Sequence, residues 1–483
     1  MKILHISAEC YPVAKVGGLA DVVGALPKYQ NRIGHKAAVI MPYYKTAWVE
    51  RATGRVVFTH QLVVDGRTYL AEVIDVDNEL GFPLFVIRVQ GLTDRAGVYG
   101  HPDDALRFIA FQRVALQWIL TFETLPEVVH CHDHHTGFIP FMMQYCPAFD
   151  KLMSVPTVLS IHNAQYQGNF DKSGVAMLPR FRESRYGLLD WYGQINPLAA
   201  AIKCAWRVNT VSPSYMEELK EQANGLEGLL RSESQKCVGI LNGIDTETWN
   251  PKTDEYLVKN FTIRLRAAGR KANKEALCEE FGLDATKPLF GFIGRLVWEK
   301  GADLLPEAIE QALNEYDINI ILLGSGAPEI EGQLEQLKFT HKGRFNAHIG
   351  YEERMSHQVY AGADFLLMPS RVEPCGLNQL YSLRYGCVPI VRRTGGLKDT
   401  VVDIGDGGHG LCHDQTSVFD IVYSIGRAEV FFREEKQFKT NQKQMMEIDH
   451  SWENTAGTYV TLYEELQPKP VAVKTGKSIK NSK

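Results

Sequence analysis

Short apolar segments alternate along the chain with segments of helical periodicity. Most of the apolar segments have the length of one β-strand and carry no alternating polar residues, which is typical of strands buried on both faces. Because strands that alternate with helices form βαβ units, this pattern predicts parallel sheets. In the first half we expect strands at Lys2–Ser7, Ala37–Met41, Val128–His130, Thr157–Ile161, Val208–Val211 and Val238–Leu241. In the second half we expect them at Leu289–Ile293, Ile318–Leu323, Ala347–Ile349, Phe365–Met368 and Val388–Val391.

The two series of strands predict an α/β fold with two doubly wound, Rossmann-like domains. A chain of 483 residues is also longer than one ordinary hydrophobic core requires. The division is expected near Asn242–Asp245, so that residues 1–241 form an N-terminal domain and residues 242–445 a second one. A charged stretch from Asn250 to about Lys274 is expected to have little regular structure.

The end of the chain divides into a predicted helix and a predicted tail. Residues 446–466 are expected to form a C-terminal helix that opens at Ser451-Trp452-Glu453, with Ser451 as its N-cap. Residues 467–483 are basic and have no apolar periodicity, so we expect them to be disordered.

Composition narrows the classes of partner. The net charge of -5 argues against nucleic acid and against an anionic membrane surface, since both attract basic proteins. The 9 cysteines include no C-x-x-C pair, which argues against a zinc knuckle or a thioredoxin-like motif. The first apolar run is interrupted by His5 and Glu9, too early for a secretory signal, and no apolar run has the length of a membrane span. A cytoplasmic protein is therefore expected.

A carboxylate, a proline and a glycine follow the predicted strand at Phe365–Met368. They lie in Glu373-Pro374-Cys375-Gly376, and a helix is expected to begin near Leu377. A helix N-terminus offers free backbone N–H groups and partial positive charge, which suit a phosphate or an electron-rich hydroxyl. A carboxylate beside it can accept hydrogen bonds from sugar hydroxyls. The alternative is that Glu373 only caps the helix.

Two other predicted strand ends carry cations beside glycines. The strand at Lys2–Ser7 leads to Lys15-Val16-Gly17-Gly18, and the strand at Leu289–Ile293 leads to Arg295 and Lys300. A glycine turn that opens a helix suits a phosphate, and a guanidinium with an ammonium suits a diphosphate. Ligands of open parallel sheets bind at this edge. A solvated lysine in a plain loop and ordinary surface ion pairs are the alternatives.

Histidines gather after the strand at Val128–His130, in Cys131-His132-Asp133-His134-His135. They invite a metal hypothesis. Period-two alternation, however, places His132 and His134 on one face and Asp133 and His135 on the other, so the ligands would not converge. We therefore predict no metal site and leave ordinary hydrogen-bonded histidines and sugar contacts as alternatives.

His162 follows the strand at Thr157–Ile161 and has the same two interpretations. It could bind a sugar hydroxyl or be a core histidine satisfied by the backbone. Gly405-Asp406-Gly407-Gly408-His409-Gly410 matches the dinucleotide fingerprint as a string. A helical stretch precedes it and a short strand at Leu411–His413 follows, which is the reverse of the context that this fingerprint requires.

Several of these motifs together resemble one enzyme family. Glu373-Pro374-Cys375-Gly376-Leu377, Arg392-Arg393-Thr394-Gly395-Gly396-Leu397 and Lys15-Val16-Gly17-Gly18-Leu19 are similar to motifs of the bacterial glycogen synthases and plant starch synthases. The resemblance extends from about Lys2 to about Leu466. It implies the GT-B glycosyltransferase architecture, in which two Rossmann-like domains face a deep cleft and the C-terminal helix crosses back to the first domain.

The activity that the resemblance implies is retaining transfer of glucose from ADP-glucose to the non-reducing end of an α-1,4-glucan such as glycogen. No metal or other cofactor is expected, and the oligomeric state is left open. The implied catalytic residues are His162, Arg295, Lys300 and Glu373, with His162 contacting the donor glucose and the cations neutralising the leaving diphosphate. The implied nucleotide-sugar contacts are Lys15, Gly17, Gly18, Asp21, Asp133, Asn242, Tyr351, Cys375, Gly376, Leu377, Thr394, Gly395 and Gly396, with Tyr351 against the base.

Two departures and two rival functions accompany this interpretation. Val16 stands where plant and many bacterial relatives carry threonine, and His134 stands where relatives often carry tryptophan, so both departures concern the acceptor side more than donor chemistry. One rival is an enzyme of the same fold that uses UDP-glucose or another acceptor. The other is a glucan-binding protein with an inactive site, against which the retained Lys15, His162, Arg295, Lys300 and Glu373 argue.

Overall fold

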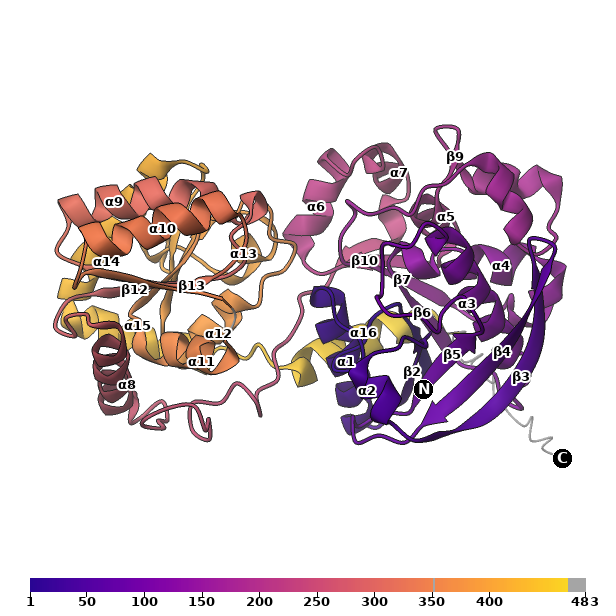
Figure 1. Ribbon diagram of the computed structural model, residues 1–483, viewed down its shortest axis with the longest axis horizontal. Helices are drawn as coiled ribbons and strands as arrows, with labels where there is room; N and C mark the ends of the chain where they lie inside the picture. Colours follow the sequence, from indigo (N-terminus) through magenta and orange to yellow (C-terminus); the bar gives the residue numbers. More distant parts are fainter. Residues whose placement is uncertain (351, 468–483) are drawn as a thin grey trace, which may run out of the picture.

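The computed structural model describes residues 1–350 and 352–467. Tyr351, expected against a nucleotide base, and the tail from residue 468 lie outside the described residues. The chain forms two α/β bodies side by side, each with a central sheet covered by helices on both faces (Figure 1). The α/β fold with two doubly wound domains is therefore confirmed.

The first sheet has nine strands within the described residues, in the order β11-β10-β7-β6-β1-β2-β5-β4-β3. All neighbours from β11 to β5 are parallel, as the continuous apolar strands predict. The strands are β1 Lys2–Ile6, β2 Lys36–Pro42, β3 Gly54–Val64, β4 Arg67–Val76, β5 Leu84–Val89, β6 Val128–His132, β7 Thr157–Ile161, β10 Arg207–Thr210 and β11 Cys237–Gly239.

Strands β3, β4 and β5 form an antiparallel edge that the strand predictions did not include. The turn between β3 and β4 is Asp65-Gly66, and both residues have positive φ, 50° and 67°. This is the backbone of a type I′ hairpin turn, for which Asp-Gly is a preferred sequence. Alternating exposed and buried positions along β3 show that one face of this edge meets solvent.

Helices cover both faces of the first sheet. Leu4 and Ile6 of β1 pack in the cluster that contains residues of α3, α4 and α5, whereas Ile3 packs with α1 and α16. The helices of the first half are α1 Gly18–Arg32, α2 Ala47–Arg51, α3 Asp104–Ile119, α4 Ile139–Tyr145, α5 Pro197–Cys204, α6 Pro213–Glu221 and α7 Glu227–Ser232. Short 3-10 turns and a small hairpin complete this half: η1 His134–Thr136, η2 Pro147–Leu152, η3 Lys172–Met177, η4 Glu183–Leu188, η5 Ser234–Lys236, β8 Asp190–Trp191 and β9 Gln194–Ile195.

The second sheet is parallel and, in the part of the chain that the structure describes, has six strands in the order β14-β13-β12-β15-β16-β17. Successive residues of β15 alternate between two cores: Phe365 and Leu367 face α9, α10 and α14, and Leu366 and Met368 face α8 and α11. The strands are β12 Leu289–Ile293, β13 Asn319–Gly324, β14 Phe345–Ile349, β15 Phe365–Met368, β16 Val388–Arg392 and β17 Leu411–His413.

The helices of the second half include one correction. Helix α8 begins at Arg266, within the stretch expected to have little structure, and ends at Phe281 with Gly282 in the left-handed conformation that favours a helix C-cap. The others are α9 Leu305–Glu315, α10 Pro328–Thr340, α11 Glu353–Gly362, α12 Asn378–Tyr385, α13 Gly395–Thr400, α14 Val418–Arg433, α15 Glu435–Glu447 and α16 Trp452–Glu464, with 3-10 turns η6 Trp298–Lys300, η7 Ala302–Leu304 and η8 Ile404–Asp406. Among the helices of the described residues, none is both long enough and apolar enough to cross a membrane.

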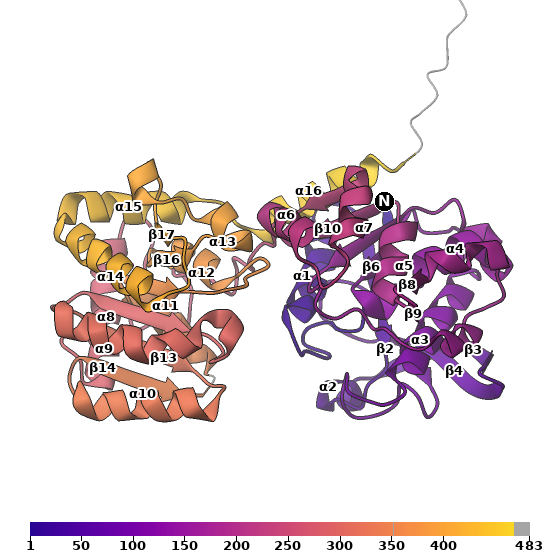
Figure 2. The same cartoon turned by 90° about the horizontal axis from the view of Figure 1, so that it is seen from above.

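Helix α16 returns from the second domain and packs on the first (Figures 1 and 2). Ser451 caps it, because its side chain accepts a hydrogen bond from the backbone N–H of Asn454. Trp452, 4% exposed, lies in the same buried cluster as Ile3 and Val22. The backbone of the departing chain meets the returning chain here, since Ile244 pairs with Ser451 in a parallel bridge.

Replacing Gly243 by alanine should weaken this crossing. A Cβ at Gly243 would lie 2.6 Å from the backbone nitrogen of Trp452, so α16 would have to move. We expect Gly243→Ala to lower the free energy of unfolding by about 1–3 kcal/mol, the usual cost of overpacking. Denaturant titration of the full chain measures this change.

Gly457, within α16, is the matched control. A Cβ there would meet nothing within 4 Å, and alanine favours a helix over glycine by about 0.5–1 kcal/mol. Gly457→Ala should therefore be neutral or stabilising. Equal unfolding free energies for the two variants would contradict the tight crossing.

Candidate active site

A cleft of about 1270 Å³ lies between the two domains. Its walls are the loops that follow the carboxyl ends of strands in both sheets, which is where parallel sheets bind ligands. Of the predicted site residues, the cleft is lined by Gly17, Gly18, Asp133, His162, Asn242, Arg295, Lys300, Glu373, Cys375, Gly376 and Leu377.

The glycine turn after β1 is held by a carboxylate that sequence reasoning missed. The side chain of Glu9 accepts hydrogen bonds from the backbone N–H groups of Val16 and Gly17, at 2.5 and 3.0 Å. Its other oxygen accepts from the hydroxyl of Tyr99 at 2.6 Å. These two backbone groups are therefore occupied by the protein, and the cleft is left with the amides of Gly18 and beyond. The only sequence signal for this role is the position of Glu9, a carboxylate three residues after the end of β1.

Lys15 and Asp21 lie beside this turn but do not line the cleft. The Lys15 ammonium forms an ion pair with the Asp21 carboxylate at 2.7 Å, and both side chains are partly exposed. Their expected contact with a nucleotide sugar stays a prediction.

Asp133 and His162 lie together on the wall contributed by the first domain. Asp133 follows β6 with a positive φ of 55°, where the regular alternation of the strand ends. One of its carboxylate oxygens accepts the backbone N–H of His162 at 2.7 Å. Burial raises the pKa of Asp133 to about 7 and lowers the pKa of His162 to about 3. His162 is therefore neutral at physiological pH.

The wall contributed by the second domain carries the predicted cations. Arg295 is exposed, and its guanidinium makes no hydrogen bond or ion pair with the described residues. The Lys300 ammonium contacts Oε2 of Glu373 at 2.5 Å, and the Ser370 hydroxyl donates to the same oxygen at 3.0 Å. One cation is thus free, and the other is held by the carboxylate expected to bind sugar.

Helix α12 points its N-terminus at the cleft. Cys375, Gly376, Leu377 and Asn378 all line the cavity, and the N-terminus has no side-chain cap. Its first backbone N–H groups are therefore available to an anion or a hydroxyl. Gly376 is required by the protein itself, because its φ is +74° and a Cβ would lie 2.4 Å from the Gln379 side chain.

Thr394, Gly395 and Gly396 lie behind the Glu373 loop and do not line the cleft. A Cβ on Gly395 would approach the carbonyl oxygen of Glu373 to 2.1 Å, and one on Gly396 would approach that of Cys375 equally closely, at 2.1 Å. These glycines allow the backbone of the Glu373 loop to rest on α13. The Gly395 N–H also donates to Glu218 of the first domain at 2.7 Å. Direct contact with a nucleotide sugar stays a prediction for all three residues.

Asn242 lines the cleft with an unsatisfied polar atom. The residue is 8% exposed, and its Oδ1 is buried without a hydrogen-bond partner among the described residues. A buried acceptor without a partner is costly, and a hydroxyl donor entering the cleft would relieve that cost.

These features define the class of protein. Two doubly wound domains, with a cleft between them that carries cations on one wall and sugar-compatible polar groups on the other, are the architecture of a GT-B glycosyltransferase. Residues 273–445 match the family described as glycosyl transferases group 1, and residues 2–232 match the starch synthase catalytic domain.

Comparison with proteins that match nearly the whole chain identifies its family. The chain is 50% identical over 466 residues to a glycogen synthase of Flavobacterium johnsoniae, covering 96% of this chain and 98% of that protein. It superposes on the catalytic domain of starch synthase IV from Arabidopsis thaliana, bound to ADP and acarbose, with a TM-score of 0.86, 34% identity and coverage of 96% and 99%. A sucrose-phosphate synthase from Thermosynechococcus elongatus shares the fold, with a TM-score of 0.62, 16% identity and coverage of 96% and 98%. The chain belongs to the glycogen synthase and starch synthase family and is a glycosyltransferase.

Replacing Asp133 by asparagine should remove a pH-dependent cost. The folded carboxyl has a pKa of about 7 against 3.8 for an ordinary aspartate, so the folded protein holds a proton that the unfolded chain releases between those values. Stability of the parent from this group therefore falls as the pH rises from 4 to 7, by at most about 4 kcal/mol.

Asparagine keeps the oxygen that accepts the His162 amide and has no carboxylate to ionise. We expect the unfolding free energy of Asp133→Asn, relative to the parent, to increase between pH 4 and pH 7 and to level off above pH 7. Denaturant titrations at matched pH values measure this difference, and a difference independent of pH would show that Asp133 ionises freely in the folded protein.

Proposed function

We propose that this enzyme transfers glucose from ADP-glucose to the non-reducing end of an α-1,4-glucan with retention of configuration. The observation that carries the proposal is the cleft itself, which sets Arg295 and the Lys300–Glu373 pair of one domain opposite Asp133 and His162 of the other. The relative starch synthase IV, whose structure has ADP and acarbose bound, supports this proposal.

The leaving diphosphate is assigned to the second domain. Arg295 is a free guanidinium in the cleft, and its planar fork suits phosphate oxygens. Lys300 exchanges Glu373 for the diphosphate when the donor binds, and the unpaired N–H groups at the start of α12 add to the same charge. These groups neutralise the diphosphate as its bond to C1 of glucose breaks, and we propose that no metal ion or other cofactor is needed.

The glucosyl ring is assigned to the polar groups between the two walls. Glu373, released by Lys300, accepts hydrogen bonds from sugar hydroxyls, and so does the unpartnered oxygen of Asn242. His162 contacts the ring from the first domain. Glu373 is not assigned as a nucleophile, because retaining glycosidases pair two carboxylates across the bond, and Glu373 is the one carboxylate that the sequence places in such a motif. The acceptor hydroxyl then attacks C1 from the face that the diphosphate leaves, and the hydroxyl proton passes to the departing phosphate oxygen, so that ADP is released.

Gly17 and Gly18 supply independent support for a ligand on the first domain. A Cβ on either residue would meet nothing within 4 Å, and neither has a positive φ. Neither the packing nor the backbone of the protein therefore requires glycine at these positions. A ligand that approaches the backbone closely would exclude any side chain there and so would require glycine.

The division of labour and the compartment follow from the same assignment. Residues 1–241 carry the acceptor side, residues 242–445 bind the nucleotide sugar, and α16, within the predicted 446–466, returns to the first domain. All nine cysteines are unpaired thiols, which suits a reducing cytoplasm.

Nucleotide release in the presence of glycogen tests the function. ADP-glucose and UDP-glucose are compared, each with and without a chelator. Glycogen-dependent release of ADP that survives the chelator is expected. Release from UDP-glucose alone would show that the protein is the rival enzyme of the same fold that uses UDP-glucose. Binding of glycogen without nucleotide release from either donor would favour a glucan-binding protein.

Replacing Lys300 by methionine, or Glu373 by glutamine, should reduce kcat by roughly a hundredfold or more, because each removes a charge that acts on the transition state. Lys287→Met is the matched control, since Lys287 forms an ion pair with Asp317 at 2.7 Å and does not line the cleft. Steady-state kinetics with saturating glycogen measure the effect. Turnover within a few-fold of the parent in either cleft variant would show that these residues are assigned wrongly.

A further inference from the structure

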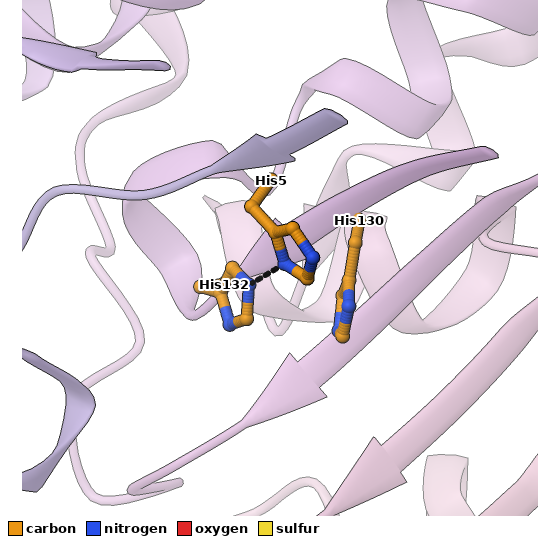
Figure 3. Close-up of side chains that lie close together, drawn as sticks. All are labelled: His5, His130 and His132. Atoms are coloured by element: carbon orange, nitrogen blue, oxygen red, sulfur yellow. Dashed lines mark hydrogen bonds between the residues drawn. The ribbon is translucent and has the colours of Figure 1, made fainter. Parts of the chain in front are cut away.

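Three buried histidines lie on the face of the first sheet that α1 and α16 cover. His5 belongs to β1, and His130 and His132 belong to β6 (Figure 3). Their ring nitrogens are close enough to suggest a metal ion. Each of the six nitrogens, however, already has a hydrogen-bond partner. A metal would require free lone pairs on these rings, so the cluster is better explained by hydrogen bonding.

The hydrogen bonds connect the cleft to α1. Nε2 of His162 lies 3.0 Å from Nδ1 of His132, and Nε2 of His132 lies 3.1 Å from Nδ1 of His5. Nε2 of His5 then lies 2.8 Å from the amide oxygen of Gln30 in α1. His162 lines the cleft, and the other three residues are each 0% exposed.

The hydrogen bonds continue from Gln30 to α16. The Gln30 amide nitrogen donates to the hydroxyl of Tyr463 at 3.3 Å, and that hydroxyl lies 2.7 Å from Nδ1 of His130. Nε2 of His130 lies 2.6 Å from the Ser160 hydroxyl, which donates to Asn209 at 2.7 Å. The amide nitrogen of Asn209 donates to the hydroxyl of Tyr459 at 3.0 Å.

One direction of donation satisfies every member of this chain. Burial lowers the pKa of His5 to about 4 and holds the pKa values of His130 and His132 well below the ordinary value, so each ring is neutral and has one donor and one acceptor. The Gln30 oxygen can only accept, so His5 donates through Nε2 and must accept through Nδ1.

The same reasoning applies to the next two rings. His132 donates to His5 through Nε2 and accepts through Nδ1, and His162 therefore donates to His132 through Nε2. The Nδ1 atom of His162 is then a bare acceptor, and it has no hydrogen bond within the described residues. The Asn209 amide, which follows Tyr463 in this chain of hydrogen bonds, has the same direction of donation as the Gln30 amide: its oxygen accepts and its nitrogen donates.

We propose that Gln30 and Tyr463 are positioning residues that hold His162 in the Nε2–H tautomer, with its Nδ1 lone pair offered to a sugar hydroxyl in the cleft. The identity of that ligand rests on the proposed function, whereas the tautomer does not. His162 in this state accepts a hydrogen bond and cannot donate one from Nδ1, so it selects a hydroxyl over an acceptor-only group at that position. A hydroxyl on α16 thereby helps to set the chemistry of His162 in the cleft.

Nitrogen NMR of the full chain labelled with ¹⁵N-histidine tests the proposal directly. Bare and protonated ring nitrogens have well-separated shifts, and single substitutions of His5, His130, His132 and His162 assign the signals. We expect all four rings to be neutral Nε2–H tautomers. An Nδ1–H tautomer at His162 in the parent protein would overturn the proposal, whether or not the enzyme transfers glucose.

Tyr463→Phe breaks the chain at its centre, and Tyr459→Phe is the matched control at its end. Both tyrosines are 0% exposed on α16, so the two variants lose the same atom from similar surroundings. Without the Tyr463 hydroxyl, the Gln30 amide loses the acceptor that fixes its direction. We expect a second His162 tautomer to appear and kcat/KM for the donor to fall roughly fivefold to tenfold, the worth of about one hydrogen bond.

In Tyr459→Phe the bonds from His162 to Tyr463 remain, so we expect unchanged His162 signals and activity within about twofold of the parent. A purely structural role would lower the stability of both variants and leave the His162 tautomer unchanged in both. Unchanged His162 signals in folded Tyr463→Phe would overturn the proposal. If that variant does not fold, the tautomer of the parent still decides. A parent without transferase activity would refute the proposed function alone.

Discussion

The packing of α16 on the first domain is the constraint on which the active site depends. The chain leaves the first sheet after β11, builds the whole second domain, and then returns to bury Trp452, Tyr459 and Tyr463 against α1 and β1. This return fixes the first domain and the second to each other at two crossings of the chain. The carboxyl ends of both sheets consequently border one cleft, and residues more than 130 positions apart, such as His162 and Arg295, share it.

The two walls of the cleft differ in charge. The second domain holds the cations and the start of α12, whereas the first domain holds neutral histidines and a carboxyl whose pKa is raised to about 7 by burial. In the proposed function this difference places the diphosphate on the wall of the second domain and the less polar sugar and glucan toward the first domain. The ion pair of Lys300 and Glu373 keeps both groups partnered, which avoids the cost of leaving either charge unpaired in a partly buried site.

Sequence reasoning succeeded where local signals were sufficient. Continuous apolar strands gave both parallel sheets, and residues just after strand ends gave Asp133, His162, Arg295 and Glu373 of the cleft. The strand predictions missed β3, β4 and β5, although the Asp65-Gly66 dipeptide is a typical signal for the hairpin turn between β3 and β4. The capping of Val16 and Gly17 by Glu9 required knowledge of how the loop folds back. The chain of hydrogen bonds from His162 to Tyr463 includes one between residues 433 positions apart, so no pattern within a window of sequence contains it.

Glycines in this enzyme show why motif and role must be separated. Packing within the protein requires glycine at Gly376, Gly395 and Gly396, because a Cβ at each position would lie 2.4 Å or less from a neighbouring atom. Gly17 and Gly18 have open space around them and ordinary backbone angles, so neither packing nor backbone conformation requires glycine there. Both kinds of glycine occur in motifs that look alike as strings. The distinction is three-dimensional: the first kind lets the loop that carries Glu373 pack closely, and the second leaves open space on the opposite wall of the cleft.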